Sequence, residues 1–500
     1  MEAASVPARH FHDGTLLENL AQSYGDHFNG MGLQMPFRCV GATLVIFWAS
    51  VSSGSEAVQF VLMAIAAHYK DRGVNVTFRH RFSCEGKKPK QEWMRDLFSE
   101  LGIEEGCVFQ REEDLCRAHA FCCKHGKDCP VPDCDLLIAG TSCKDFSKAT
   151  TKHSTGLMAY LHHRAVEILL LENVDTLDEC DPSKAMESGL DNMKSQLRHL
   201  GLCPCPLLTD SFLFGIPQER RRLYIVAVKQ SGSMLFDFGS RPLALVYESL
   251  KRCLVECQRQ APCLSELFLD AGDARIESKL NERIAKGACS VQYNVSALAK
   301  TYKEGGIRWG ASDLDEELHQ CVWFSTLTPY RQAVLKCSRN EFAEGEVLCR
   351  DISQSAARVR HSKCVDGQHV AMSQTPEQII WLEVPGQEPR LQMGVEAMLI
   401  QGFPIAKVPR LVGSVSDDFL MAKAGNTIDS VLSLAILQSL FSSITWRLGA
   451  CQTERPVSLP KNMADNAMAC FDAMCVVSEE DEDGARGPCN SLKRRRRDGV

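Results

Sequence analysis

Cys143 stands where a nucleophile would be expected. It lies in the run DLLIAGTSCKDFS, where a strand-like apolar stretch gives way to small residues and then to the thiol. Two other runs offer complementary groups: LLLENVD contains the carboxyl of Glu172, and GIPQERRRLYIVAV contains the guanidinium groups of Arg220 and Arg222. A sulfur nucleophile, a carboxyl group and fixed cations are what attack on a heteroaromatic ring requires.

Each of these runs, taken alone, has an ordinary structural explanation. A cysteine after a strand is usually a small buried hydrophobe, an asparagine-containing turn is usually a cap or a turn, and an arginine triplet is usually a solvated face. All three runs fall at the ends of expected strands. Because ligands of doubly wound folds bind at the carboxyl ends of strands, the combination favours a shared site.

The first half of the chain alternates short apolar runs with amphipathic stretches, which predicts a parallel sheet covered on both faces. We expect strands at residues 43–49, 74–83, 135–139, 167–171 and 222–228, and helices at residues 56–69, 89–101 and 157–164.

The chain divides into five expected segments by composition and periodicity. Residues 1–40 are an N-terminal extension, 41–228 the α/β core, 229–390 a second domain, 391–450 a C-terminal part of the core, and 451–500 a disordered acidic and basic tail. Within the fourth segment, residues 424–440 read as one helix with an apolar face that rejoins the core.

Composition places limits on the class of protein. The formal charge of -7 excludes a uniformly basic coat but allows a basic cleft. The 24 cysteines are scattered through apolar segments and the first residues contain no apolar signal core, which favours a reducing compartment. The most apolar stretches, 58–67 and 431–440, are too short to cross a bilayer, so no membrane span is predicted.

The order of these motifs, from about residue 43 to residue 440, resembles that of the cytosine-5 DNA methyltransferase family. The resemblance implies an α/β, Rossmann-like S-adenosylmethionine-dependent methyltransferase core with a smaller inserted target recognition domain. It also implies that Cys143 adds to carbon 6 of a flipped-out cytosine in duplex DNA, that carbon 5 then takes a methyl group from S-adenosyl-L-methionine, and that elimination frees the enzyme.

Further roles follow from the resemblance. Glu172 would bind the exocyclic amine and ring nitrogen 3 and would hold a proton near neutral pH, which a buried pocket favours. Arg220 and Arg222 resemble the pair that holds the cytosine carbonyl oxygen and steadies the nucleophile.

The resemblance also gives a cofactor site. The run WASVSSGSE, with Ser53 and Gly54, occupies the place of the family's glycine-rich loop but keeps one glycine. Glu85 resembles the acid that binds the ribose hydroxyls, and Asp114 the residue that faces the adenine amine. Asn426, in the run AGN, resembles the last family motif, which closes the methionine end of the pocket.

The segment 229–390 stands where the family has its target recognition domain. Arginine and aromatic side chains in it suit phosphate and base contacts. They are Arg308, Trp309, Trp323, Tyr330, Arg331, Arg358 and Arg360.

Two other groups of residues could bind a metal or direct the protein to the nucleus. Cysteines and histidines gather between residues 116 and 134, but their spacing matches no paired Cys-x-x-Cys pattern, so we expect reduced thiols in a connecting loop and no metal. The members are Cys116, His119, Cys122, Cys123, His125, Cys129 and Cys134. The run KRRRR at residues 493–497 favours nuclear import, and hence a nuclear protein.

Two alternatives stay open. One branch of the family methylates cytosine in tRNA, although its characteristic Cys-Phe-Thr segment is not apparent. The chain could also be a catalytically inactive nucleic-acid-binding homologue. The single glycine in the cofactor loop and a short stretch after Ser147 both favour that alternative. The chain also has Ser142 where the family has proline.

Overall fold

The computed structural model describes most of the chain. The described residues are 5–31, 43–140, 154–178, 188–230, 233, 235–236, 242–286, 300, 303, 320–338, 347–355, 358–365 and 367–446.

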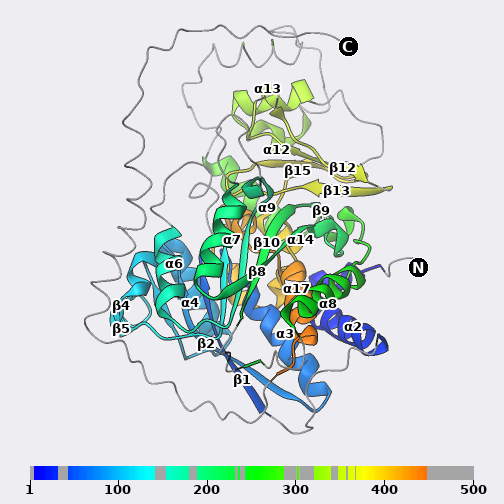
Figure 1. Ribbon diagram of the computed structural model, residues 1–500. Coiled ribbons are helices and arrows are strands. Elements are labelled where there is room, and N and C mark those ends of the chain that lie inside the picture. The colour runs from blue at the N-terminus through cyan, green and yellow to red at the C-terminus, as the bar shows by residue number, and fades with distance from the viewer. Residues whose placement is uncertain are drawn as a thin grey trace, which may run out of the picture.

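A nine-stranded sheet organises the larger part of these residues (Figure 1). Its strands are β1 (Thr43–Val51), β2 (Asn75–Cys84), β3 (Cys107–Phe109), β4 (His119–Cys122), β5 (Lys127–Pro130), β6 (Leu136–Gly140), β7 (Ile168–Val174), β8 (Leu202–Asp210) and β10 (Arg221–Lys229). The spatial order is β5-β4-β3-β2-β1-β6-β7-β10-β8. Strands β3, β2, β1, β6 and β7 run parallel, and β10 runs antiparallel to both β7 and β8. The predicted α/β fold with a largely parallel sheet is confirmed.

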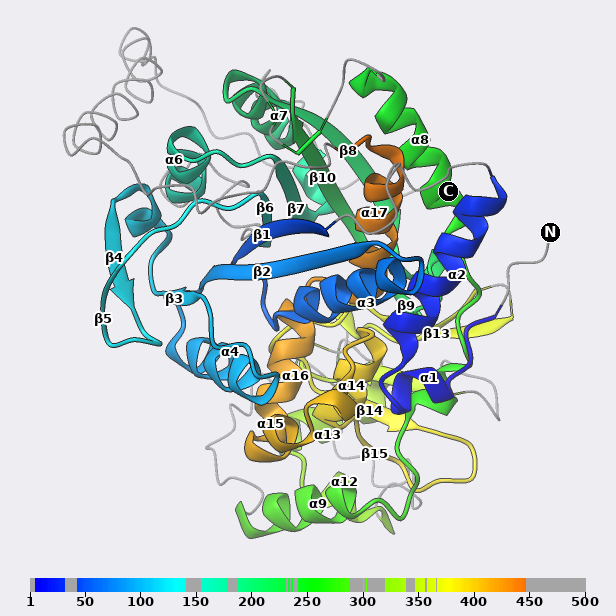
Figure 2. The same cartoon turned by 90° about the horizontal axis from the view of Figure 1, so that it is seen from below.

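Helices cover both faces of this sheet. Figure 2 shows α2 (Leu16–Gly30) and α3 (Ala57–Asp71) on one side of β1 and β2, and α6 (Ser154–His163) and α7 (Gly189–His199) on the other. The strand side chains divide accordingly. In β6, Leu136 and Ile138 join the cluster that contains α3, whereas Leu137 and Ala139 join the one that contains α6. Alternation along a doubly buried strand explains why these strands read as continuous apolar runs.

A smaller lobe lies above the sheet in Figure 1. It contains β11 (Leu348–Asp351), β14 (Ile380–Glu383) and β15 (Arg390–Leu391) in one sheet, and β12 (Lys363–Val365), β13 (Gln368–Met372) and β9 (Gln218–Glu219) in another. Its helices are α9 (Ala274–Lys286), α12 (Val322–Ser325) and α13 (Pro329–Ser338). Because β9 directly precedes β10 in the chain, the parallel pairing of Ala371 with Gln218 joins the lobe to the core.

Short 3-10 helices connect several of these elements. They are η1 (Glu112–Cys116), η2 (Asp175–Asp178), η3 (Ser211–Leu213), η4 (Leu264–Leu267) and η7 (Ile405–Lys407).

The core includes residues that the sequence analysis assigned to other segments. After α1 (Arg9–His12), α2 buries Leu20 and Tyr24 and packs against α3 and α17 (Ser430–Ser443). Helix α8 (Leu243–Glu256) also packs against α17, although its residues belong to the expected second domain. Elements on both sides of residue 40, and on both sides of residue 229, therefore pack into one core.

The remaining helices of the core are α4 (Lys88–Glu100), α14 (Gly394–Ile400), α15 (Pro409–Ser414) and α16 (Asp417–Asn426).

The prediction of a single helix at residues 424–440 is wrong, because two helices share this range. The chain leaves α16 after Asn426 and starts α17 at Ser430, where the Asp429 carboxylate accepts a hydrogen bond from the Leu432 amide at 2.8 Å and caps the new helix.

Helix α17 is buried on every side, so it has no polar face. Residues 417–443 are long and apolar enough to cross a membrane, but 83% of the apolar window is buried inside the protein, as in the core helix of a globular domain.

Candidate active site

The side chains of Glu172 and Arg222 meet at the end of β7. Arg222 lies opposite Val174 in the β7–β10 pairing, two residues from Glu172, so the two side chains leave the sheet on the same face and meet diagonally. Arg222 Nε is 3.1 Å from Glu172 Oε1, and the side chains are only 16% and 13% exposed. The structure thus brings together two of the four residues that the sequence placed in the catalytic site.

Cys143, the expected nucleophile, lies outside the described residues. It follows β6, whose last residue, Gly140, is the register partner of Glu172. The end of β6 also approaches the loop after β1, because a Cβ on Gly140 would lie 2.7 Å from the Ser52 carbonyl oxygen. These neighbouring strand ends form the point where strand order reverses, which is where doubly wound folds bind ligands.

Arg220 is almost fully buried beside this pair. Its Nη2 donates to the Thr427 carbonyl at 2.9 Å and its Nη1 to the Gln374 carbonyl at 3.4 Å. Burial, and next the charge of Arg222, lower the pKa of Arg220 to about 10. Two of its terminal nitrogens are therefore bonded to protein carbonyls, and Arg220 ties the α16–α17 connection to the small lobe. The resemblance had implied that Arg220 and Arg222 together hold the cytosine carbonyl oxygen and steady the nucleophile.

The loop after β1 turns through left-handed backbone conformations. Ser52, Gly54 and Glu56 have φ values of 51°, 81° and 60°. A Cβ on Gly54 would lie 2.0 Å from the Asn426 carbonyl oxygen, so only glycine fits at this close approach. The Asn426 side chain turns back onto its own helix and donates to the Ala422 carbonyl at 2.8 Å. Asn426 therefore meets the loop through its backbone.

Ser53 and Ser55 are buried within the same loop. Among the described residues, the Ser55 hydroxyl has no hydrogen-bond partner. An unsatisfied buried hydroxyl is costly, and it is the kind of group that a ligand or an ordered water satisfies.

Lys423 was missed by the sequence analysis. It is buried on α16, and its Nζ donates to the Gly54 carbonyl at 2.8 Å. Burial, followed by the positive charge of Lys90, lowers the pKa of Lys423 to about 7. In the sequence, Lys423 is a single cation between apolar residues of a helix. That pattern does not distinguish a buried site residue from a solvent-exposed lysine.

Glu85 directly follows β2 and is 4% exposed. Its Oε1 accepts from the Lys87 amide at 3.2 Å, and its Oε2 pairs with Lys90 Nζ at 3.2 Å. The structure therefore places a nearly buried carboxylate at the end of the strand next to β1, as the sequence predicted.

Among the acids of η1, Asp114 pairs with Arg117 Nη1 at 3.0 Å. Glu112 approaches the loop instead, since its Oε1 accepts from the Ser52 hydroxyl at 2.9 Å. The sequence could not choose among three consecutive acids, because the choice depends on how η1 docks.

The aromatic and basic residues of the small lobe divide into two groups. Trp323 is 2% exposed and belongs to the hydrophobic core, so the expectation that it contacts bases is wrong. Arg358 and Arg360 are exposed, and Arg360 pairs with Asp351 at 3.2 Å. Arg308 and Trp309 lie outside the described residues.

Comparison with curated proteins identifies relatives that share part of their length with this chain. The Type II methyltransferase M.BsuFI of Bacillus subtilis is 27% identical over 179 residues, which cover 31% of this chain and 40% of the relative. The DNA (cytosine-5-)-methyltransferase DMT5 of Cryptococcus neoformans is 28% identical over 429 residues, which cover 78% of this chain and 17% of the relative. The chain therefore spans less than half the length of these relatives.

Among solved structures, the S. pombe Dnmt2 methyltransferase is similar with a TM-score of 0.41 and 13% identity, over 79% of this chain and 98% of that one. The profile of the family described as C-5 cytosine-specific DNA methylase matches residues 122–406, more than half of the 500 residues. The match includes Cys143, Glu172, Arg220 and Arg222. This chain belongs to the C-5 cytosine-specific DNA methylase family.

Proposed function

We propose that this protein transfers a methyl group from S-adenosyl-L-methionine, the methyl donor of its family, to carbon 5 of a cytosine in DNA. The observation that carries the proposal is the Glu172–Arg222 pair at the end of β7, directly beside the end of the strand that leads to Cys143. A carboxylate held by a guanidinium beside the strand that precedes Cys143 in the sequence matches the needs of covalent attack on a pyrimidine.

In the proposed reaction, the Cys143 thiolate forms a bond to carbon 6, and the displaced electron pair makes carbon 5 nucleophilic. Glu172 holds the amine edge of the base, and Arg222 keeps that carboxyl in place while stabilising the negative charge that develops on the ring. After carbon 5 has gained the methyl group, it loses its proton to solvent and the sulfur–carbon 6 bond breaks. The ring and the thiolate are thereby restored.

The residues around the β1 loop fit the methyl donor, which supplies an electrophilic methyl group when bound. Glu85 would accept from the ribose hydroxyls, because each of its carboxylate oxygens keeps a second lone pair beyond its present partner. The unsatisfied Ser55 hydroxyl offers a further polar contact. Lys423 would hold the loop through the Gly54 carbonyl.

We further propose that the small lobe is the target recognition domain and that DNA binds between it and the core. Support comes from Arg222, whose Nη2 donates to the Ser373 hydroxyl at 3.4 Å, so the catalytic pair lies at the junction of the two parts. A base inside a duplex is unreachable, so the target cytosine would be flipped out.

We also propose that the protein is nuclear. The basic run at residues 493–497 supports this location.

The test is methyl incorporation from labelled S-adenosyl-L-methionine into duplex DNA and into tRNA. We expect transfer to DNA by the wild type and none by Cys143→Ser, with Cys263→Ser, which alters an exposed thiol, unchanged. Transfer to tRNA alone would replace the DNA substrate. No transfer to either, with no heat of cofactor binding in calorimetry, would contradict the proposed activity.

A further inference from the structure

Three cysteines and a histidine converge at the β3 edge of the nine-stranded sheet. Cys107 begins β3, Cys122 ends β4, His125 lies in the β4–β5 turn and Cys129 lies on β5. Their ligand atoms all lie within 4.8 Å of one another. His125 Nδ1 is 3.3 Å from Cys122 Sγ, 3.4 Å from Cys129 Sγ and 3.7 Å from Cys107 Sγ.

The three sulfur–nitrogen distances are close to the edges of a small tetrahedron. Zinc–sulfur bonds of about 2.3 Å and zinc–nitrogen bonds of about 2.0 Å place neighbouring tetrahedral ligands roughly 3.5–3.8 Å apart. The three sulfur–nitrogen distances cluster around that range, so a central ion could bind all four atoms after small side-chain adjustments.

The backbone around Cys122 is also arranged as in a metal-binding turn. The Val108 amide donates to Cys122 Sγ at 3.4 Å. The turn closes through the Gly126 amide, which donates to the Cys122 carbonyl at 2.8 Å, with φ of +65° at Gly126. Amides directed at a sulfur stabilise a thiolate, which is the form that binds metal.

We propose that Cys107, Cys122, His125 and Cys129 bind one structural zinc ion. Four protein ligands of the Cys₃His type leave no open position, which is typical of structural rather than catalytic zinc. The sequence predicted a connecting loop without a metal, because the spacing of the cysteines and histidines within residues 116–134 matches no zinc pattern. Cys107 lies outside that range and joins the cluster from β3. The expected loop is a β-hairpin formed by β4 and β5.

Zinc would fasten a weakly attached part of the sheet. The only register pair between β3 and β4 is Phe109 with Cys122, and on the hairpin Phe121 remains 44% exposed. Small elements with little apolar burial commonly depend on a metal. Since η1 lies between β3 and β4 and its Glu112 contacts Ser52, the ion would also stabilise one wall of the proposed cofactor site.

The experiment uses the full chain, purified without chelators. Elemental analysis should find a single zinc ion per chain, and exchange with cobalt(II) should give sulfur-to-metal charge-transfer and tetrahedral d–d absorption. Cys122→Ser and Cys129→Ser should lose the ion. The matched control Cys123→Ser should keep it, because that thiol faces Gln91 at 3.2 Å and lies outside the cluster.

Cys129→His replaces one ligand by another and should retain metal with weaker charge-transfer absorption, which separates ligand loss from misfolding. Wild-type protein that contains no zinc and takes up no cobalt would overturn the proposal. Zinc retained in both serine variants, or a disulfide between Cys122 and Cys129 in the freshly purified wild type, would do the same.

Discussion

Arg222 determines how the Glu172 carboxyl is presented. Each of its guanidinium nitrogens has a partner: Nε pairs with Glu172, Nη1 donates to the Arg221 carbonyl at 2.7 Å, and Nη2 donates to the Ser373 hydroxyl. A planar guanidinium engaged at three points is fixed in position as a lysine ammonium cannot be. The side chain therefore positions the acid as well as supplying charge.

We predict that Arg222→Lys lowers the single-turnover rate of methyl transfer by about 100-fold or more, because a misplaced donor no longer stabilises the developing charge. The matched control is Arg221→Lys, since Arg221 is exposed and its contact with Asp175 is long, at 3.9 Å. Equal rates for the two variants would show that Arg222 takes no part in catalysis.

At this scale the sequence predicted that Glu172 and Arg222 lie in one site, and the structure pairs them, but the sequence did not predict their surroundings. Arg222 lies in the run GIPQERRRLYIVAV, and Glu172 lies at the end of an expected strand. These two positions were sufficient to predict that the side chains lie close together. The bonds of Arg220 to the Thr427 and Gln374 carbonyls were not predictable, because their partners lie more than 150 positions away in the chain. The contribution of Cys107 to the thiol cluster was not predictable for another reason, because Cys107 lies on a separate strand, β3.

At the scale of elements, the loop after β1 and the end of α16 fit together at Gly54. The Asn426 carbonyl occupies the space that a side chain would fill, and Lys423 bonds to the Gly54 carbonyl. The loop after β1 is thus shaped by a helix that follows it by more than 350 residues.

We predict that Gly54→Ala destabilises the fold by more than Gly102→Ala. Both glycines have positive φ, +81° and +68°, and alanine in that conformation costs about 1–2 kcal/mol. Around Gly102 the described residues leave open space, whereas the Gly54 Cβ would strike backbone. Denaturant unfolding gives the two free energies, and calorimetry should show weaker cofactor binding for Gly54→Ala alone. Equal losses of stability would contradict the contact.

Long apolar elements were predictable, and short or polar ones were not. The strands around residues 43–49 and 135–139 appear as β1 and β6 because their apolar runs are buried on both faces. Strand β4 is only four residues long, and β5 buries only Cys129 of its four residues, so neither has the long apolar run that identifies a strand in the sequence. The break before α17 falls in the run GNTIDS at residues 425–430, where Asp429 caps the new helix.

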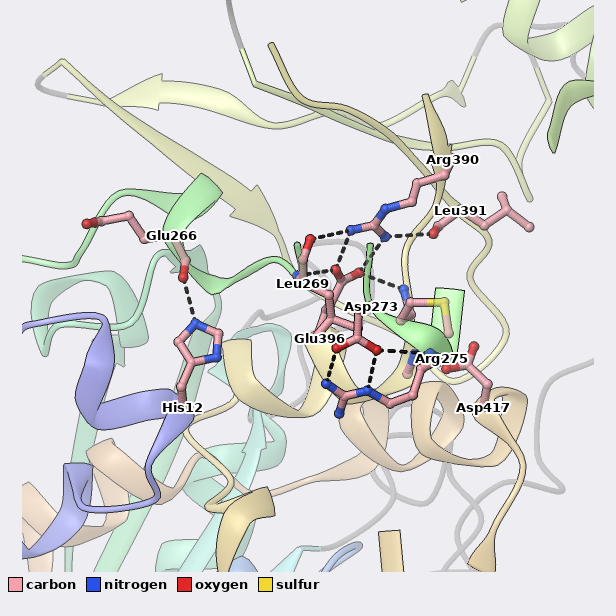
Figure 3. Close-up of polar contacts among 11 residues, drawn as sticks. His12, Glu266, Leu269, Asp273, Arg275, Arg390, Leu391, Glu396 and Asp417 are labelled. Atoms are coloured by element: carbon pink, nitrogen blue, oxygen red, sulfur yellow. Dashed lines mark hydrogen bonds and ion pairs between the residues drawn. The ribbon is translucent and has the colours of Figure 1, made fainter. Parts of the chain in front are cut away.

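At the scale of the whole molecule, a buried ion pair joins the small lobe to the core. Figure 3 shows Arg390 of β15 facing Glu396 of α14, with distances of 2.5 Å from Nη2 to Oε1 and 3.0 Å from Nη1 to Oε2. The Glu396 carboxylate also accepts from the Leu269 and Met393 amides at 2.7 and 2.8 Å. Neither charged side chain is more than 4% exposed, so each depends on the other for compensation.

We predict that Glu396→Gln lowers the free energy of unfolding by about 3–5 kcal/mol, since it leaves the Arg390 charge buried without a counterion. Asp273→Asn, in the neighbouring Arg275–Asp273 pair of Figure 3, should cost at most about 1 kcal/mol because Arg275 is half exposed. The double substitution Arg390→Met with Glu396→Gln should recover much of the loss, because glutamine keeps an acceptor for the buried amides and no unpaired charge remains. A double variant less stable than Glu396→Gln would contradict this account of the junction.

The central claim is that Cys143 attacks a cytosine held by Glu172 and Arg222, and it is tested most directly with duplex DNA that contains 5-fluorocytosine. Fluorine at carbon 5 prevents the final loss of a proton, so the sulfur–carbon bond cannot break. With S-adenosyl-L-methionine present, we predict a protein–DNA adduct that survives denaturation and is absent for Cys143→Ser. An adduct that still forms with Cys143→Ser, or a wild type that methylates ordinary cytosine in DNA yet traps no adduct, would contradict the claim.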